Sequence, residues 1–175
     1  TTITISVVSH RPELNKKNYM QDNSDYINLS ELIDYLHDLK FCVRLTCVCC
    51  KNMMDNSQEV AEFIKFAKEN KVEQVTLRPV NDEYRRESAH LWILENKLTD
   101  ENKRDIKDYL EKNGTKLLEL ERIGTIYDVD GQNVLFSLPL TKYTRDTNPE
   151  NLRNLIFFQD GHIRYEWEME GGILL

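Results

Sequence analysis

Glycine, proline and cysteine are scarce in this sequence of 175 residues, which contains 6, 4 and 4 of them, respectively. So few glycines and prolines exclude collagen-like and low-complexity chains, and four cysteines are too few for a disulfide scaffold of this length. Hydrophobic residues make up 40% and charged residues 30% of the sequence, which is the mixture of a folded protein that buries a core. The length fits one domain.

Long apolar runs are also missing. No stretch approaches the ~18 consecutive apolar residues that a membrane-spanning helix needs, and the first residues lack the charged and apolar regions of a signal peptide. The net charge of −7 argues against a nucleic-acid partner, because phosphate backbones are bound by clustered basic residues. We therefore expect no nucleic-acid and no membrane partner.

Several enzyme signatures do not occur. The GxSxG, GxxxxGK[ST] and GxGxxG patterns of hydrolases, P-loop proteins and dinucleotide sites are absent from the sequence. The four histidines are dispersed and show no spacing of a metal site. Any chemistry must therefore come from other residues.

The four cysteines, Cys42, Cys47, Cys49 and Cys50, crowd into one apolar segment. Neighbouring side chains of a strand point to opposite faces, so these thiols cannot converge on one ion, and we expect no metal there. Buried free thiols behave as small hydrophobes and are typical of a reducing compartment. We therefore expect a cytoplasmic protein.

Strands and helices alternate over the first eighty residues, a pattern that favours parallel neighbouring strands with right-handed crossovers. Asn28 has the capping position of the first helix, and Val60, Phe63, Ile64 and Ala67 form the apolar face of the second. The predicted segments are strands at 1–8, 42–50 and 72–80, helices at 28–39 and 57–67, and a polar loop at 9–28.

Each of these strands has an apolar side and a polar side. The predicted polar sides are Thr2, Thr4 and Ser6, then Arg44 and Thr46, then Gln74, Thr76 and Arg78. A parallel sheet covered on both faces is apolar on both. We therefore predict an α/β fold in which residues 1–82 form a partial (β/α) barrel half with three parallel strands, whose interior holds a polar ligand.

The pattern changes after residue 82. We expect a helical connection over 83–122 and a small antiparallel β-hairpin extension over 123–175, within one continuous α+β fold. Thr99 caps the second helix of the connection, Gly114 ends it, and Trp92 fits the core side of the first. The predicted segments are helices at 83–94 and 99–113 and hairpins pairing 123–129 with 132–138 and 155–158 with 163–167.

Two arginines and two hydroxyl residues are the candidate site. Arg44 lies in the middle of a strand, where a guanidinium is either a clamp for a carboxylate or one half of a structural ion pair. Arg78 lies at the carboxyl end of its strand, the edge at which α/β folds bind ligands. Ser6 and Thr46 either donate hydroxyls to a ligand or are satisfied polar core positions.

Three segments resemble the last three strands of the radical S-adenosylmethionine superfamily, whose members use a six-stranded partial (β/α) barrel. The segments are TISVVS at 4–9, FCVRLTCV at 41–48 and EQVTLRPV at 73–80. Residues 51–57 and 59–67 fit the region after the fifth strand of that barrel. YDVDGQN at 127–133 and FQDGHIRYEW at 158–167 resemble extensions of some members.

This resemblance implies S-adenosylmethionine as the cofactor. It places Ser6 against the methionyl or ribose part, Arg44 at the methionine carboxylate and Thr46 close by. Arg78 would reach the barrel mouth, towards a small-molecule or peptide substrate whose identity stays open.

The sequence departs from the family at its defining motif. The CxxxCxxC loop that holds a [4Fe–4S] cluster is absent, and so is the glycine-rich motif after the second strand. Without that cluster nothing here delivers the electron that cleaves S-adenosylmethionine. We expect either the C-terminal portion of a longer radical enzyme, with the cluster only in the full-length protein, or a half-barrel by itself, inactive as this chain alone.

Two alternatives stay open. The first is a non-catalytic α+β interaction domain that pairs through the open sheet edge of residues 1–8, including an edge-strand dimer. The second is an enzyme that uses Arg44 and Arg78 on an anionic substrate without a cofactor, although no general base stands near them in the sequence.

Overall fold

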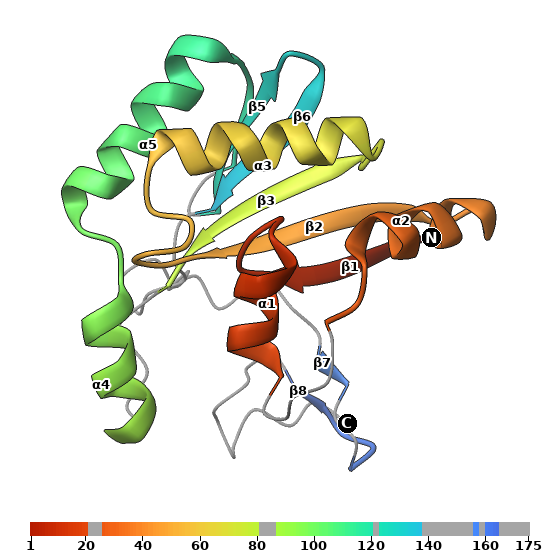
Figure 1. Ribbon diagram of the computed structural model, residues 1–175, viewed down its shortest axis with the longest axis horizontal. Helices are drawn as coiled ribbons and strands as arrows, with labels where there is room; N and C mark the ends of the chain where they lie inside the picture. The colour runs from red at the N-terminus through yellow and green to blue at the C-terminus, as the bar shows by residue number, and fades with distance from the viewer. Residues whose placement is uncertain (21–25, 81–86, 121–122, 138–155, 158–159, 165–175) are drawn as a thin grey trace. The chain divides into compact units, whose positions relative to one another are not determined.

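The computed structural model describes residues 1–20, 26–80, 87–120, 123–137, 156–157 and 160–164. The chain divides into two compact units, Thr1–Tyr143 and Thr144–Leu175. The elements of the first unit in chain order (Figure 1) are β1 (Thr2–Val7), α1 (Pro12–Tyr19), α2 (Leu29–Asp38), β2 (Cys42–Cys49), α3 (Ser57–Glu69), β3 (Gln74–Pro79), α4 (Glu87–Asn96), α5 (Asp100–Asn113), β4 (Thr115–Leu120), β5 (Gly124–Val129) and β6 (Gln132–Ser137).

The first unit is built on a six-stranded mixed sheet with the order β1-β2-β3-β6-β5-β4. β1, β2 and β3 are parallel neighbours joined through α2 and α3, as the alternation of strands and helices predicts. β6 is parallel to β3, and β5 is antiparallel to both β6 and β4. The sequence-based prediction of three parallel strands is therefore confirmed.

The described part of the sheet is not closed into a barrel, because it ends in β1 on one side and β4 on the other. The predicted hairpin around Asp130 and Gly131 forms as β5 and β6, but it continues the main sheet instead of making a separate one. The reason is that β3 has a free edge, and β6 satisfies its backbone groups. Val134 and Phe136 of β6 thereby join the same core as β3.

Two elements lie where the sequence pattern did not predict them. α1 occupies part of the predicted polar loop at 9–28, and it begins with Pro12, which suits a first helical turn because its missing N–H needs no partner there. β4 follows directly after Gly114, inside the predicted helical connection. Its six residues are nearly all exposed, so the burial pattern that marks most strands is absent.

The predicted helix caps are confirmed. The Asn28 side chain accepts hydrogen bonds from the backbone N–H groups of Ser30 and Glu31 at the start of α2. Thr99 and Asn102 form a reciprocal capping box at the start of α5, and Gly114 ends that helix. These caps satisfy backbone donors that helix ends leave open.

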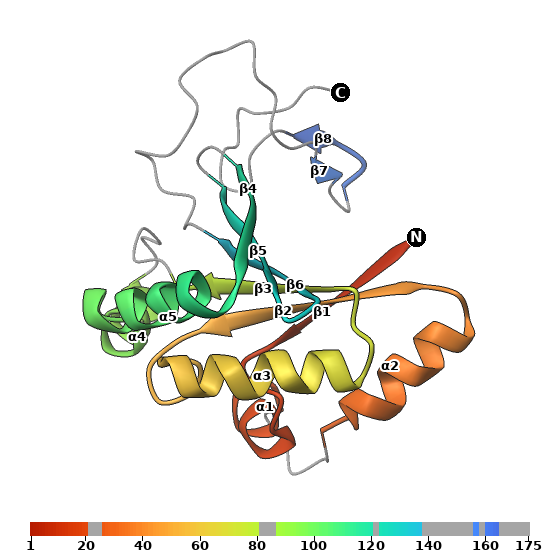
Figure 2. The ribbon, with the colours of Figure 1, turned by 90° about the horizontal axis from the view of Figure 1, so that it is seen from above.

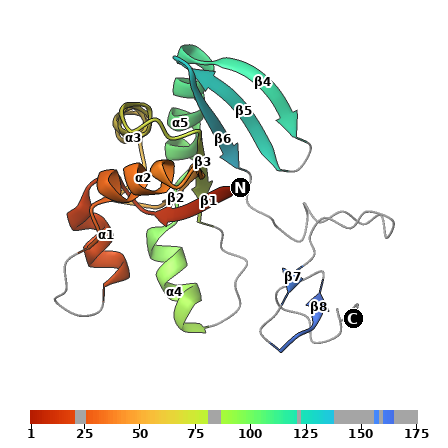
Figure 3. The ribbon, with the colours of Figure 1, turned by 90° about the vertical axis from the view of Figure 1, so that its right-hand side faces the viewer.

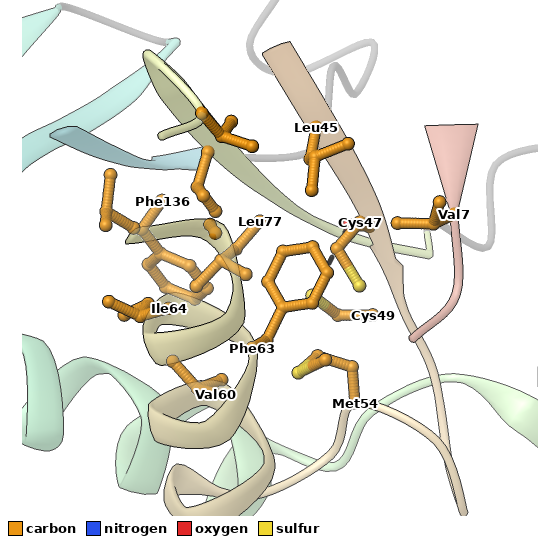
Figure 4. Close-up of a cluster of buried hydrophobic side chains, with 14 of the residues drawn as sticks. Val7, Leu45, Cys47, Cys49, Met54, Val60, Phe63, Ile64, Leu77 and Phe136 are labelled. Atoms are coloured by element: carbon orange, nitrogen blue, oxygen red, sulfur yellow. Dashed lines mark hydrogen bonds between the residues drawn. The ribbon is translucent and has the colours of Figure 1, made fainter. Parts of the chain in front are cut away.

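One hydrophobic core lies between the sheet and the helices α2, α3 and α5 (Figure 2). The predicted apolar face of α3 is confirmed, with Phe63 fully buried against Cys47, Cys49 and Leu77 of the strands (Figure 4). The prediction for Trp92 is wrong, because Trp92 is 44% exposed and its neighbour Ile93 is buried instead.

The second unit contains a short antiparallel pair, β7 (Ile156–Phe157) and β8 (Ile163–Arg164). The pair confirms the predicted hairpin at these residues, and Gly161 adopts the positive φ of 85° that its turn requires. The other residues of the predicted hairpin segments, 155, 158 and 165–167, lie outside the described residues.

Candidate functional site

On each strand, the core residues occupy every second position. The residues between them therefore point to the opposite face of the sheet. α2, α3 and α5 pack on the core side (Figures 2 and 3). We call the other side the helix-free face, because no described helix packs on it. The four candidate residues, Ser6, Arg44, Thr46 and Arg78, all lie on this face, as the alternation predicts.

Strand register arranges these side chains in rows across the three parallel strands. Ser6 is opposite Thr46, and Thr46 is opposite Thr76, which makes a row of three hydroxyls. Strands lie ~4.8 Å apart, so neighbouring hydroxyls of such a row can contact the same ligand. Ser6 is exposed, whereas Thr46 and Thr76 are 7% and 4% exposed. The row therefore runs from an open edge into a covered part of the sheet.

Arg44 belongs to the adjacent row, between Thr4 and Gln74. Its Nε donates a hydrogen bond to Oε1 of Gln74 at 2.6 Å, and the side chains are half-buried. Arg44 forms no ion pair within the described residues, so the structural ion pair that the sequence left open is not seen there. A neutral amide orients the guanidinium without neutralising it, and the other guanidinium nitrogens can still bind an anion.

Arg78 lies two residues beyond Thr76 on β3, opposite Val48 of β2. Two residues of strand span ~7 Å, so Arg78 stands beyond the hydroxyl row at the carboxyl ends of the parallel strands. Its side chain is exposed and forms no ion pair with the described residues. Arg44 and Arg78 therefore place two cationic groups on opposite sides of the hydroxyl row.

The turn after β1, next to Ser6, is held by Asn15 of α1. The fully buried Asn15 accepts hydrogen bonds from Val8 N at 2.9 Å and Ser9 N at 3.4 Å, and its amide donates to Ser9 O at 2.7 Å. Burial lowers the pKa of the adjacent His10, and the charge of Arg11 lowers it further. Nothing in the sequence pattern identified Asn15, because its role depends on the turn that it closes.

Glu73, the residue before β3, holds the beginning of β2. Its Oε2 accepts a hydrogen bond from Val43 N at 2.6 Å and lies 3.3 Å from Nε2 of His37 in α2. Burial raises the pKa of the Glu73 carboxyl, but these two contacts outweigh burial, so the pKa lies below its ordinary value. The ionised carboxylate therefore links α2 to the start of β2, beside Arg44.

The cysteines form no metal centre in the described part of the chain, where no three His, Cys, Asp or Glu side chains are grouped to hold an ion. Cys47, Cys49 and Cys50 are free and fully buried, and Cys42 is exposed. Burial raises the pKa of Cys47 well above its usual range and that of Cys50 to about 11. Cys47 and Cys49 pack in the hydrophobic core, where they serve as small apolar side chains.

Sequence reasoning placed Gln74 on the polar side but did not identify it as the partner of Arg44. That assignment needs the register, because Arg44 and Gln74 are thirty residues apart and become neighbours only when β2 pairs with β3.

No family model, curated protein or solved structure matches this chain. In the described residues, no helix has the length and apolar character needed to cross a membrane.

Proposed function

We propose that this chain is the C-terminal part of a radical S-adenosylmethionine enzyme and contributes part of the cofactor pocket on the helix-free face. The observation that supports the proposal is the environment of Arg44. Its guanidinium is oriented by the neutral Gln74 side chain and keeps its charge, next to a row of hydroxyls on three parallel strands. A cation beside several hydroxyls suits a ligand with both a carboxylate and a ribose.

Different residues of this chain would contact different parts of S-adenosylmethionine and the substrate. Arg44 would bind the methionine carboxylate, and the hydroxyls of Ser6 and Thr46 would hydrogen-bond to the polar groups beside it. Arg78, beyond the hydroxyl row, would face the substrate. These roles follow from the three strand segments that resemble the family and from the shared face of the four side chains.

S-adenosylmethionine supplies one-electron chemistry when an iron–sulfur cluster reduces it. The CxxxCxxC segment that holds this cluster in the family does not occur in the sequence. The chain by itself would therefore bind and orient the cofactor without cleaving it.

The proposal is tested by NMR on the ¹⁵N-labelled chain, which detects weak binding to part of a pocket. S-adenosylmethionine should shift the backbone amides of Ser6 and Thr46 and the Nε–H of Arg44. Methylthioadenosine, which lacks the amino-acid part, should leave the Arg44 signal in place. Arg44→Gln should weaken binding about tenfold, the usual effect of losing one charge-assisted contact.

The matched control is Arg104→Gln, an exposed arginine of α5. It should bind S-adenosylmethionine as the unaltered chain does. If the amides of β1 and β2 do not respond, or if Arg44→Gln binds equally well, the cofactor role is wrong.

A second candidate function is an interaction domain that pairs through β1. The observation that favours it is the contrast between the two edges of the sheet. β4 carries Lys116 and Glu119 as an ion pair and a register shift between Lys116 and Leu118, both of which discourage pairing with another chain. β1, with the sequence TITISV, has no charge, no proline and no bulge.

The edge-pairing candidate predicts a dimer through β1. Thr4→Lys adds an exposed charge to this edge, and Thr115→Lys adds the same charge to the edge at β4. Light scattering after gel filtration should show a dimer for the unaltered chain and for Thr115→Lys but a monomer for Thr4→Lys. A monomer at every concentration of the unaltered chain would exclude this candidate.

A further inference from the structure

The hydroxyl row of the helix-free face continues into an aliphatic row. Thr76 of β3 is opposite Leu135 of β6, which is opposite Ile126 of β5, and Ile126 is opposite Leu118 of β4. The complete row, in the order of the sheet, is Ser6, Thr46, Thr76, Leu135, Ile126 and Leu118. One straight line across six strands is thus polar in its first half and apolar in its second.

The aliphatic half is accessible to solvent. Leu118 is 51% exposed, and Leu135 and Ile126 are half-buried. Single exposed aliphatic residues are ordinary on protein surfaces, but three on adjacent strands make a continuous patch, and such patches mark binding surfaces. From Leu135 to Leu118 the patch spans two strand spacings, which is ~10 Å.

The charges around this patch favour an anion. Arg78 stands next to the point where the row changes from hydroxyl to aliphatic, and it forms no ion pair with the described residues. The acid nearest the patch on β5 is Asp128, and its Oδ1 accepts a hydrogen bond from Gly131 N at 2.6 Å within the hairpin turn. Glu119 of β4 is paired with Lys116. Asp128 lies two residues from Ile126 toward the hairpin turn, whereas Arg78 lies two residues beyond Thr76 at the carboxyl end of β3, so the charge on the Arg78 side of the row is positive.

We infer that the helix-free face binds an organic anion with an apolar body, the acidic group at Arg78 and the apolar part along Leu135, Ile126 and Leu118. The inference rests on the proposed function, because it names the class of substrate that Arg78 would face. The hydroxyls of Thr46 and Thr76 lie between this site and the cofactor contacts at Arg44. A carboxylate on an aliphatic chain is the simplest molecule with these two parts.

Three matched probes of equal chain length, octanoate, octanol and octylammonium, separate charge from apolar contact in NMR titrations below their aggregation limits. Octanoate should shift the amides of β3, β5 and β6. It should bind about fivefold more tightly than octanol, as expected of one solvent-exposed charge pair, and octylammonium should bind most weakly.

Two variants test the charged half and the aliphatic half of the site separately. Arg78→Gln should remove the preference for octanoate over octanol and leave octanol binding unchanged. Ile126→Ser should weaken both probes, and Leu118→Ser, at a more exposed position, does the same test if Ile126→Ser does not fold. The controls are Arg104→Gln and Leu91→Ser, an exposed leucine of α4, and neither should change binding.

Equal binding of octanoate and octylammonium would overturn the inference, as would shifts confined to α4. A concentration-dependent dimer that buries Leu118 and Ile126 in light-scattering and NMR experiments would also overturn it, because a second copy would then be the occupant. Failure of the cofactor proposal is read at Arg44 and Ser6 with S-adenosylmethionine. Failure of the organic-anion proposal would appear as unchanged octanoate binding in the variants of Arg78 and Ile126, so the two failures are distinguishable.

Discussion

Replacing Arg44 by methionine distinguishes a ligand-binding arginine from one that holds the fold together. The Nε of Arg44 donates to Oε1 of Gln74 at 2.6 Å, and both side chains are half-buried on the helix-free face. Because the acceptor is a neutral amide, the substitution removes one hydrogen bond and leaves no buried carboxylate without a counter-ion. Methionine also keeps most of the volume of the arginine stem.

The expected loss follows from these contacts. A hydrogen bond to a charged group contributes about 1.5–3 kcal/mol, and partial exposure places Arg44 near the lower limit, so Arg44→Met should reduce the free energy of unfolding by about 1–2 kcal/mol. Breaking a buried ion pair would cost about 3–5 kcal/mol. Leu45→Ala, at the next position of β2 but fully buried in the core, should cost about 2–5 kcal/mol.

Urea denaturation followed by circular dichroism measures these differences. Arg44→Met, Gln74→Met and the double variant form a double-mutant cycle, and its coupling energy should be about 1 kcal/mol. Leu45→Ala is the control for the sensitivity of β2 to substitution. If Arg44→Met costs more than about 3 kcal/mol, the arginine is structural, and its use as a carboxylate ligand loses its physical basis.

Three other places in the first unit test how the fold is held. Gly124→Ala should destabilise the chain by at least about 2 kcal/mol in urea, because its φ is 146° and an added Cβ would lie 2.1 Å from Phe136 O; Gly131→Ala, with φ 83° and no atom within 4 Å, should cost less. Glu73, whose folded pKa is lowered, stabilises the chain above its unfolded pKa, and this stabilisation is lost as the pH falls through the folded pKa. Its carboxylate is nearly half exposed, so the unfolding free energies of the unaltered chain and Glu73→Gln should differ by less than about 1 kcal/mol at pH 7 and converge in acid; a constant difference would refute the assignment. A thiol reagent at pH 8 should label Cys42 in the folded chain and label the three buried cysteines only after unfolding, as counted by mass spectrometry; early labelling of Cys50 would contradict its burial.

Local signals in the sequence predicted the elements with strong periodicity. The apolar stripe of α3, the caps at Asn28 and Thr99 and the turn at Asp130 and Gly131 each depend on residues a few positions apart, so they can be read without the fold. The sequence did not predict α1 and β4, because their apolar residues show little periodicity. α1 buries only Asn15, and the residues of β4 face solvent on both sides.

The alternation of polar and apolar residues on β1, β2 and β3 is enough by itself to place Ser6, Arg44, Thr46 and Arg78 on one face. It is enough because side chains of a strand alternate between its two faces whatever the strand pairs with. The same alternation could not reveal how many strands the sheet has or whether it closes, because these depend on which edges find partners.

Pairing across long sequence separations was decided only by the tertiary structure. The union of β3 with β6 brings Thr76 next to Leu135, and the union of β2 with β3 brings Gln74 to Arg44. Backbone groups along a strand edge are satisfied by any strand of suitable length, so local sequence does not specify the partner. The sequence therefore determined which side chains share the helix-free face, and the fold determined which of them are neighbours on it.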